Sequence, residues 1–364
     1  MTTDIFSKIF PFPRYLDIPA VGIDISGRSV KYVEFEKHGE CLKIKRFGSK
    51  NIEKKMIEKG EVRSKEDLIS CFNELNKELV NKYITVSLPE EKAFLRVVKL
   101  PLMDESQIKK SLEVQLEELI PFSPEDVIYD FEIIKNPSQK GVLEIALSAF
   151  PRKIIEDYTD VFTRTGMSPI IFELENHSLF RALVKSNTKE PTMIIDFGKT
   201  RTSFIIGEGG VVKFGSTINV AGENIERALA KNLNIDILEA EKVKKKTILQ
   251  RIEGDNILDA IFPIISVIKD EVRQIKNYWQ THAEEQGFKN KEIGKIVLCG
   301  GDSNMVGLTD YLSYELETVV EVGNPWINIT SFEKYVPEIE RRESLKYATA
   351  IGLALRSLGN FKSL

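Results

Sequence analysis

One short pattern occurs twice in this chain: an apolar strand that ends in an aspartate, a tight turn of small residues, and a second apolar strand. The first copy occupies residues 21–35 and carries Asp24, and the second occupies residues 192–206 and carries Asp196. Each copy predicts a β-hairpin, because apolar runs on both sides of a Gly- and Ser-containing turn are typical of paired strands. Two such hairpins, far apart in the sequence, predict duplicated halves that close on one ligand.

The turn after Asp24 carries groups that suit an anion and a metal ion. Its residues are Ser26, Gly27, Arg28 and Ser29. Successive N–H groups in such a turn can form an anion-binding nest. Asp24 can hold a hydrated Mg²⁺, since Mg²⁺ prefers oxygen ligands, and Lys31 can reach a phosphate as a point charge. Asp, Gly and Ser also make turns for purely structural reasons, so one copy alone leaves both interpretations open.

A third, glycine-rich turn follows the apolar run at residues 296–299. In this order the three turns resemble the phosphate-1, phosphate-2 and adenosine motifs of the actin-like ATPase superfamily. Within it, the chain most resembles the PilM family of type IV pilus assembly proteins, in the FtsA-like branch. The supporting stretches are residues 99–101, 118–122, 130–132, 220–225, 323–326 and 347–355.

This resemblance implies an α/β fold with two ribonuclease-H-like lobes around a nucleotide cleft, and a β/α insertion of the FtsA and PilM type in the first lobe. It implies ATP and Mg²⁺ as cofactors, with Asp24 and Asp196 orienting the metal mostly through water. The nucleotide-binding residues that it implies are Asp24, Ser26, Gly27, Arg28, Ser29, Lys31, Asp196, Gly198, Lys199, Thr200, Thr202, Gly222, Glu223, Glu226, Gly300, Gly301, Asp302 and Ser303.

Several of these positions depart from the family pattern. Ser26-Gly27-Arg28 stands where Gly-Ser-Ser is common, and Asp302 stands where a third small residue is usual. Glu226 replaces a hydroxyl residue, and both Glu223 and Glu226 have an alternative interpretation as solvated helix acids. We therefore expect nucleotide binding with at most slow hydrolysis.

The resemblance and the pattern of strands and helices divide the chain into segments. Residues 1–19 are expected to form an N-terminal tail. It either lies against the fold or is a short amphipathic segment that contacts a membrane or a partner. The first lobe comprises residues 20–88 and 151–190, with residues 89–150 inserted as a small β/α subdomain. The second lobe spans residues 191–343, with residues 221–292 as its helical subdomain. Residues 344–364 form a connecting helix that returns to the first lobe. We expect residues 48–63 to form a loop, a kink or break at Pro263, and a solvated face for the lysines at 242 and 244–246.

Composition limits the classes of function. A chain of 364 residues is longer than one core usually serves, so two lobes are expected. The net charge of −4 gives no electrostatic reason to expect nucleic acid as a partner. The three cysteines are scattered, which disfavours a zinc site or a disulfide framework and fits a reducing cytoplasm.

In PilM-like proteins the inserted subdomain helps to form a cleft for the N-terminal cytoplasmic peptide of PilN, an inner-membrane protein. The candidates for peptide contact are Leu119, Ile120 and Phe122, which have an alternative interpretation as core residues of the small subdomain. By this resemblance the protein is cytoplasmic and recruited peripherally to the inner membrane. Other pilus platform or motor proteins and a second copy of the chain are further candidate partners.

By the same resemblance, Glu173 and Glu175 are candidates for orienting the attacking water, since they lie in the segment that does so in hydrolysing members of the superfamily. Acids at a helix start also complement the helix dipole, so this role has a structural alternative. Two other functions compete with pilus assembly. An FtsA-like division protein would add a linker and an amphipathic membrane helix, and the printed chain shows neither. A sugar or acid kinase would need a catalytic carboxylate in a sugar pocket, and no candidate stands out.

Overall fold

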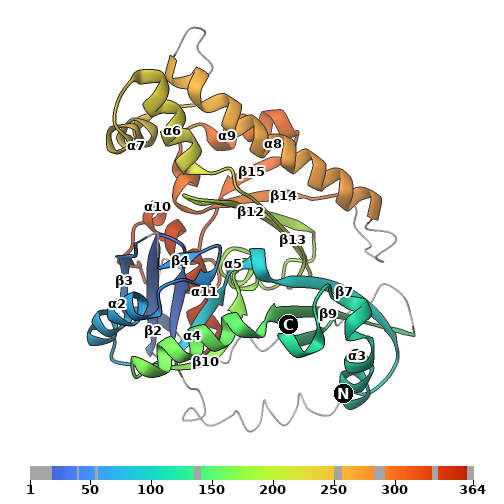
Figure 1. Ribbon diagram of the computed structural model, residues 1–364. Helices are drawn as coiled ribbons and strands as arrows, with labels where there is room; N and C mark the ends of the chain where they lie inside the picture. Colours follow the sequence, from blue (N-terminus) through green and yellow to red (C-terminus); the bar gives the residue numbers. More distant parts are fainter. Residues whose placement is uncertain are drawn as a thin grey trace.

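The computed structural model describes residues 19–38, 41–53, 56–134, 141–249, 256–282, 292–329 and 335–358. It has two lobes, each built on a five-stranded sheet, and a third, smaller sheet beside the first lobe (Figure 1). The expected N-terminal tail falls almost entirely outside the described residues.

The sheet of the first lobe has the strand order β10-β6-β1-β2-β3. Its strands are β1 (Val21–Ile25), β2 (Ser29–His38), β3 (Cys41–Asn51), β6 (Tyr83–Leu88) and β10 (Ser168–Leu174). β1 is antiparallel to β2 and parallel to β6, and β10 is parallel to β6. One face packs on α2 (Lys65–Glu78) and α4 (Arg152–Arg164) through a core that includes Phe72 and Phe162.

The sheet of the second lobe repeats this arrangement in the order β13-β12-β11-β14-β15. Its strands are β11 (Thr192–Phe197), β12 (Thr202–Glu208), β13 (Val211–Ile218), β14 (Lys295–Cys299) and β15 (Val319–Val322). β11 is antiparallel to β12 and parallel to β14, and β15 is parallel to β14, as their counterparts are in the first lobe. The duplication inferred from the two hairpins is therefore present in the topology.

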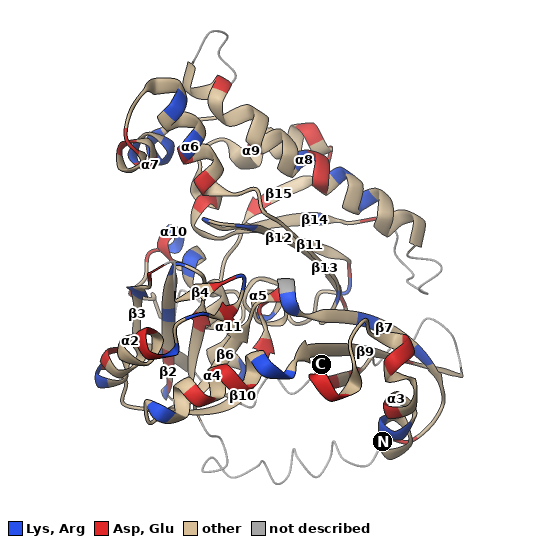
Figure 2. Cartoon of the chain, in the orientation of Figure 1, with Lys and Arg blue, Asp and Glu red and all other residues tan. Residues whose placement is uncertain are grey.

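The second lobe carries its helices on its outer side (Figure 1). They are α6 (Gly222–Leu233), α7 (Ile237–Lys246), α8 (Asn256–His282) and α9 (Leu308–Leu316). α8 continues through Pro263, so the expected break is absent; its buried stripe, from Leu258 to Trp279, anchors the helix on both sides of the proline. Figure 2 shows acidic and basic residues interspersed over both lobes rather than sorted onto one face.

Two helices lie between the sheets of the two lobes. These are α5 (Glu175–Leu183) and α11 (Ala348–Arg356), which share one core with strands of both sheets. They cross closely because α11 has small side chains: a Cβ on Gly352 would lie 1.9 Å from the carbonyl oxygen of Ser178. α11 is preceded by α10 (Arg341–Ser344) and the 3₁₀ turn η5 (Leu345–Tyr347).

The small sheet has the order β7-β9-β8 and is antiparallel throughout. Its elements are η2 (Glu90–Lys92), β7 (Phe94–Pro101), α3 (Glu105–Leu119), η3 (Pro124–Asp126), β8 (Val127–Ile133) and β9 (Val142–Pro151). α3 begins at a capping box between Asp104 and Gln107 and packs its apolar side on the sheet.

The described parts of the expected loop, residues 48–53 and 56–63, contain more regular structure than expected. β3 extends to Asn51, and β4 (Ile57–Glu58) pairs with β5 (Glu61–Val62). The reason is burial, because Ile52 and Ile57 both belong to the core of the first lobe.

Candidate functional site

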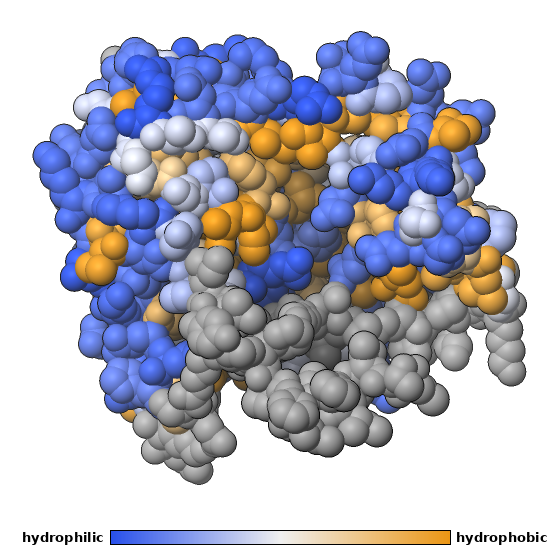
Figure 3. Space-filling model, turned by 90° about the horizontal axis from the view of Figure 1, so that it is seen from below, coloured by the Kyte–Doolittle hydropathy of each residue, from blue (hydrophilic) through white to orange (hydrophobic). Residues whose placement is uncertain are grey.

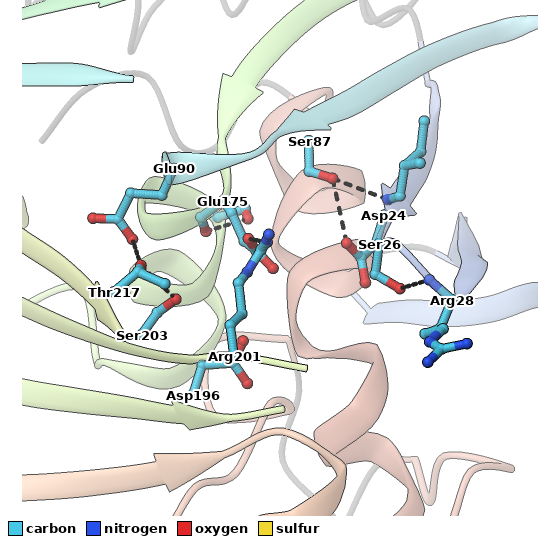
Figure 4. Close-up of polar contacts among 12 residues, drawn as sticks. Asp24, Ser26, Arg28, Ser87, Glu90, Glu175, Asp196, Arg201, Ser203 and Thr217 are labelled. Atoms are coloured by element: carbon cyan, nitrogen blue, oxygen red, sulfur yellow. Dashed lines mark hydrogen bonds and ion pairs between the residues drawn. The ribbon is translucent and has the colours of Figure 1, made fainter. Parts of the chain in front are cut away.

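Asp24 and Asp196 lie at equivalent ends of equivalent strands, on opposite sides of one space between the lobes (Figure 4). Glu175, at the start of α5, belongs to the same space. Burial raises the pKa of Asp196, and repulsion from Asp24 adds to the rise. Burial also raises the pKa of Glu175 to about 7, with Asp24 and Asp196 contributing. Arg201 and Lys31 lie beside these three carboxyl groups, and their positive charges offset part of the rise in pKa.

These carboxyl groups do not form a ready-made metal cage. In the part of the chain that the structure describes, no group of three His, Cys, Asp or Glu side chains is arranged to hold a metal ion. Mg²⁺ suits such a site, since it keeps several waters and takes one or two carboxylates together with phosphate oxygens. The donor set therefore fits Mg²⁺ held mostly through water.

Lys31 is paired directly with Asp24. The antiparallel register of β1 and β2 sets the two residues opposite each other, and Lys31 Nζ lies 3.1 Å from Asp24 Oδ2. Burial lowers the pKa of Lys31, but its attraction to Asp24 outweighs burial and leaves the pKa above its ordinary value. Ser87, from the neighbouring strand β6, donates to Asp24 Oδ1 at 3.3 Å. Asp24 is thus held in place by two partners.

The first turn is closed by one of its own hydroxyl groups. Ser26 Oγ accepts hydrogen bonds from the backbone N–H groups of Arg28 (3.4 Å) and Ser29 (3.1 Å). The hydroxyl group of Ser26 therefore takes up two of the N–H groups of the turn that were expected to bind an anion. Arg28 reaches across to the second lobe, where it forms an ion pair with Glu223, and Arg227 lies 2.7 Å from the other oxygen of Glu223.

The second turn is attached to the start of α6. The carbonyl oxygens of Gly198 and Lys199 accept hydrogen bonds from the N–H groups of Gly222 (3.1 Å) and Glu223 (2.8 Å). Thr200 is exposed at the tip, whereas Thr202 is fully buried and donates to the carbonyl of Val220 at 2.6 Å. Thr202 therefore ties β12 to the segment that leads from β13 into α6, and its hydroxyl does not face the cleft as expected.

Glu226 and Asp302 are joined by a buried lysine. Lys244 Nζ lies 2.8 Å from Glu226 and 2.5 Å from Asp302, and Lys199 is 3.8 Å from Glu226. Burial lowers the pKa of Lys244, but the two acids outweigh it and raise the pKa above its ordinary value. The expected solvated face thus holds for Lys242 and its exposed neighbours but is wrong for Lys244, which points into the lobe.

The third turn combines one crowded and one open glycine. Gly300 has φ +86°, and a Cβ there would lie 2.4 Å from Asp196 Oδ1. Gly301 begins the short helix η4 (Gly301–Asn304), and a Cβ there would meet nothing within 4 Å. Ser303 is buried and donates to the carbonyl of Gly300 at 2.7 Å. Gly301 therefore offers open backbone beside the cleft, and Ser303 stabilises the turn.

Glu173 and Glu175 point to different places. Glu175 pairs with Arg201 in the cleft, whereas Glu173 pairs with Arg181 behind α5. Burial raises the pKa of Glu173, but Arg181 outweighs burial and holds it below the ordinary value. Only Glu175 is placed to act on a ligand between the lobes, and the expectation for Glu173 is wrong because its strand, β10, faces it away from that space.

A cavity of about 620 Å³ lies on that other side, where the small sheet, the first lobe and part of the second lobe meet. Its lining comes from β8, β9, β10 and α5, with Val212 of β13, and includes Ile128, Phe131, Glu173, His177, Phe180 and Arg181. Figure 3 shows several groups of hydrophobic side chains among hydrophilic ones on the face seen from below, one of them just above the middle.

The three residues expected to contact a peptide do not line this cavity. Ile120 is 4% exposed and belongs to the core of the small sheet, Leu119 packs against that core, and Phe122 is 38% exposed. Because α3 ends at Leu119, Ile120 caps it and turns inward. Ile120 is therefore a core residue rather than a contact surface.

Sequence reasoning missed Ser87, Glu90, Asn176 and Arg201. Ser87 reaches Asp24 only through the parallel pairing of β1 with β6, which no local pattern reveals.

Within the described residues, no helix is both long and apolar enough to cross a membrane.

The fold and the paired aspartate hairpins define the class: this is a protein of actin-like ATPase fold. The family model described as type IV pilus assembly protein PilM matches residues 22–358, and the chain belongs to that family. A solved structure titled PilM-PilN type IV pilus biogenesis complex is similar, at 22% identity and a TM-score of 0.78, covering 95% of this chain and 99% of that chain.

Two further structures share the fold at lower similarity. The ethanolamine utilization protein EutJ from Carboxydothermus hydrogenoformans has 14% identity and a TM-score of 0.55, covering 92% of this chain and 89% of its own. MreB5 of Spiroplasma citri bound to ADP has 11% identity and a TM-score of 0.54, covering 94% of this chain and 96% of its own. Membership of the PilM family confirms the resemblance inferred from the three turns.

Proposed function

We propose that this actin-like type IV pilus assembly protein binds ATP with Mg²⁺ between its lobes and takes a PilN-like N-terminal cytoplasmic peptide into the cavity behind α5. In this role it links the membrane platform to the motor. The observation that carries the nucleotide site is the convergence of Asp24, Asp196 and Glu175 on one space. Recruitment by the peptide would bring a cytoplasmic protein to the inner membrane.

In the nucleotide site each group would have a defined task. Asp24 and Asp196 would hold the waters of Mg²⁺, and the ion would neutralise phosphate charge when bound. Thr200 and the first turn would contact phosphate oxygens, and Gly301 would lie against the base or ribose. Glu175, whose pKa is near 7, would position a water, and its ion pair with Arg201 is consistent with slow hydrolysis at most.

The cavity behind α5 suits an extended peptide with both apolar and charged side chains. Ile128 and Phe131 give it apolar walls, while Glu173 and Arg181 give it a charged end. The similar structure of a PilM-PilN complex supports a PilN-like peptide as the occupant. In this proposal the peptide lies away from Leu119, Ile120 and Phe122.

Calorimetric titration with Mg-ATP tests the nucleotide site. Asp24→Asn and Asp196→Asn should each weaken Mg-dependent binding by about tenfold or more, which corresponds to ~1.4 kcal/mol. Asp310→Asn, on the exposed side of α9, is the matched control and should bind as the parent does. Unchanged affinity in both cleft variants would refute the site.

A synthetic PilN N-terminal peptide tests the cavity. Ile128 and Phe122 are both 38% exposed, but only Ile128 lines the cavity. Ile128→Ala should weaken peptide binding by several-fold, and Phe122→Ala should leave it unchanged. The opposite ranking would return the peptide to the surface beside α3.

A further inference from the structure

A carboxyl side chain of the first lobe is inserted into the second lobe at Glu90. Glu90 begins η2, which leads from β6 toward the small sheet, and its Oε2 accepts a hydrogen bond from Thr217 of β13 at 3.3 Å (Figure 4). A Cβ on residue 215, also in β13, would lie 1.8 Å from Glu90 Oε1. The carboxyl group therefore fits into β13 only because residue 215 is glycine.

The same niche includes a buried amide from α5. Asn176 is 1% exposed, hydrogen-bonds to Glu90, and its Nδ2 would lie 2.5 Å from the same Cβ on residue 215. Its Oδ1 has no hydrogen-bond partner among the described residues. A buried acceptor without a donor costs free energy. A protonated Glu90 has an O–H group that can donate a hydrogen bond. If the Asn176 amide rotates by half a turn, its Oδ1 takes the place of Nδ2 and can accept that hydrogen bond.

The charged groups around the niche also bear on the protonation of Glu90. Glu175 of α5 and Arg201 of the second lobe face it, while Lys92, on its own element, pairs with Glu61 at 2.5 Å. Burial raises the pKa of Glu90 to about 8 and Glu175 adds to the rise, while Arg201 and the hydrogen bonds from Asn176 and Thr217 oppose it.

We propose that Glu90 is a proton-dependent clasp between the lobes. As a neutral acid it stays in the niche beside Gly215 and holds η2, α5 and β13 together. Once ionised it leaves the niche, because Arg201 and the hydrogen bonds from Asn176 and Thr217 offset only part of the cost of burying its charge, and β13 separates from η2. The clasp depends on the two-lobe fold and not on which ligand the cleft takes, so its failure would leave the proposed function standing.

Energy transfer between two dyes on the full chain, without nucleotide, tests the clasp. The dyes are placed at Asn73→Cys on α2 and Lys242→Cys on α7, both exposed, in a Cys41→Ser background, because Cys71 and Cys299 are buried. Transfer in the parent should fall as the pH rises from about 6 to about 10, with its midpoint near the pKa of Glu90. Glu90→Gln mimics the neutral acid and should keep high transfer throughout.

Glu223→Gln is the matched control, since Glu223 is another carboxylate that joins the lobes. It should keep the pH response with the same midpoint. A parent that shows no pH response, or a Glu90→Gln variant that keeps the response of the parent, would overturn the proposal.

Thermal unfolding provides a second measurement on the same variants. The folded pKa of Glu90 lies above the unfolded one, so its stabilisation is complete below the ordinary carboxyl pKa and is lost as pH rises toward about 8. Glu90→Gln avoids this loss, and its melting temperature should rise relative to the parent across that window. A Glu90→Gln variant that becomes relatively less stable with rising pH would contradict a neutral Glu90.

Discussion

At the scale of single residues, the glycines beside the cleft have different reasons to be glycine. A Cβ on Gly222 would lie 1.8 Å from Asp302 Oδ2 and 2.9 Å from Lys244 Nζ, whereas one on Gly301 would meet nothing. We expect Gly222→Ala to lower the free energy of unfolding by about 1–3 kcal/mol, because it overpacks a buried ion cluster. Gly301→Ala should stay within about 0.5 kcal/mol of the parent. Urea denaturation of both variants at one pH measures the difference.

Gly301→Ala, the variant expected to keep the stability of the parent, also tests the nucleotide site. Gly301→Ala should weaken Mg-ATP binding even though folding is unaffected, since the added methyl group would stand where the base or ribose is proposed to lie. A Kd equal to that of the parent would mean that this backbone does not contact the nucleotide.

The sequence identifies the aspartates of the cleft but not the tasks of the polar residues around them. The two aspartates were predictable because each ends an apolar strand before a tight turn. Lys31 and Thr202 belong to the same motifs, yet one pairs with Asp24 and the other bonds to the backbone of Val220. Strand register and turn packing decide between these uses, and neither is visible in a linear motif.

At the scale of elements, α5 carries side chains to both candidate sites. Glu175 and Asn176 face the cleft side, and His177, Phe180 and Arg181 line the cavity. The helix was predictable from its sequence, but the direction of each side chain was not, which explains why Glu173 and Glu175 seemed equivalent. For Ile120 the sequence left peptide contact and a core position open for a similar reason, since the end of α3 decides whether that side chain turns inward.

Arg181 is expected to hold this arrangement together. It pairs with Glu173 and donates to the carbonyl of Gly352 on α11 at 2.9 Å. Arg181→Met should lower the free energy of unfolding at neutral pH by about 3 kcal/mol, because it leaves Glu173 buried without its main partner. Arg356→Gln is the control and should cost less, since Arg356 lies 3.9 Å from Glu173 and is 39% exposed.

The pH dependence of the Arg181→Met variant has a definite sign. In the parent, the pKa of Glu173 is lowered, so its stabilisation is present above the ordinary carboxyl pKa and is lost as pH falls through the folded value. Without Arg181, burial favours the neutral acid. The deficit of the variant should therefore shrink between about pH 7 and pH 4, as followed by chemical denaturation. A deficit that is constant over this range would assign the loss to packing alone.

At the scale of the whole molecule, the duplicated topology was predictable and the contacts between the lobes were not. Two hairpins with one pattern indicated two similar sheets, and the strand orders of the two sheets match. The pairs that join the lobes, Arg28 with Glu223 and Glu90 with Thr217, connect residues far apart in sequence. No periodicity marks such pairs, because they depend on how one lobe is set against the other.

The pair of Arg28 and Glu223 provides a test of how the lobes are held. Arg28 leaves a turn proposed to bind phosphate, so a bound phosphate would compete with Glu223 for its guanidinium group. A double-mutant cycle of Arg28→Ala and Glu223→Ala should give a coupling free energy of about 0.5–1 kcal/mol without nucleotide, since Arg28 is partly exposed. The coupling should fall with added salt and vanish in saturating Mg-ATP. Arg227→Ala removes the second ion-pair partner of Glu223, so the contribution of that pair can be measured separately. A coupling free energy that is undiminished in Mg-ATP would show that Arg28 stays paired with Glu223 when the cleft is filled.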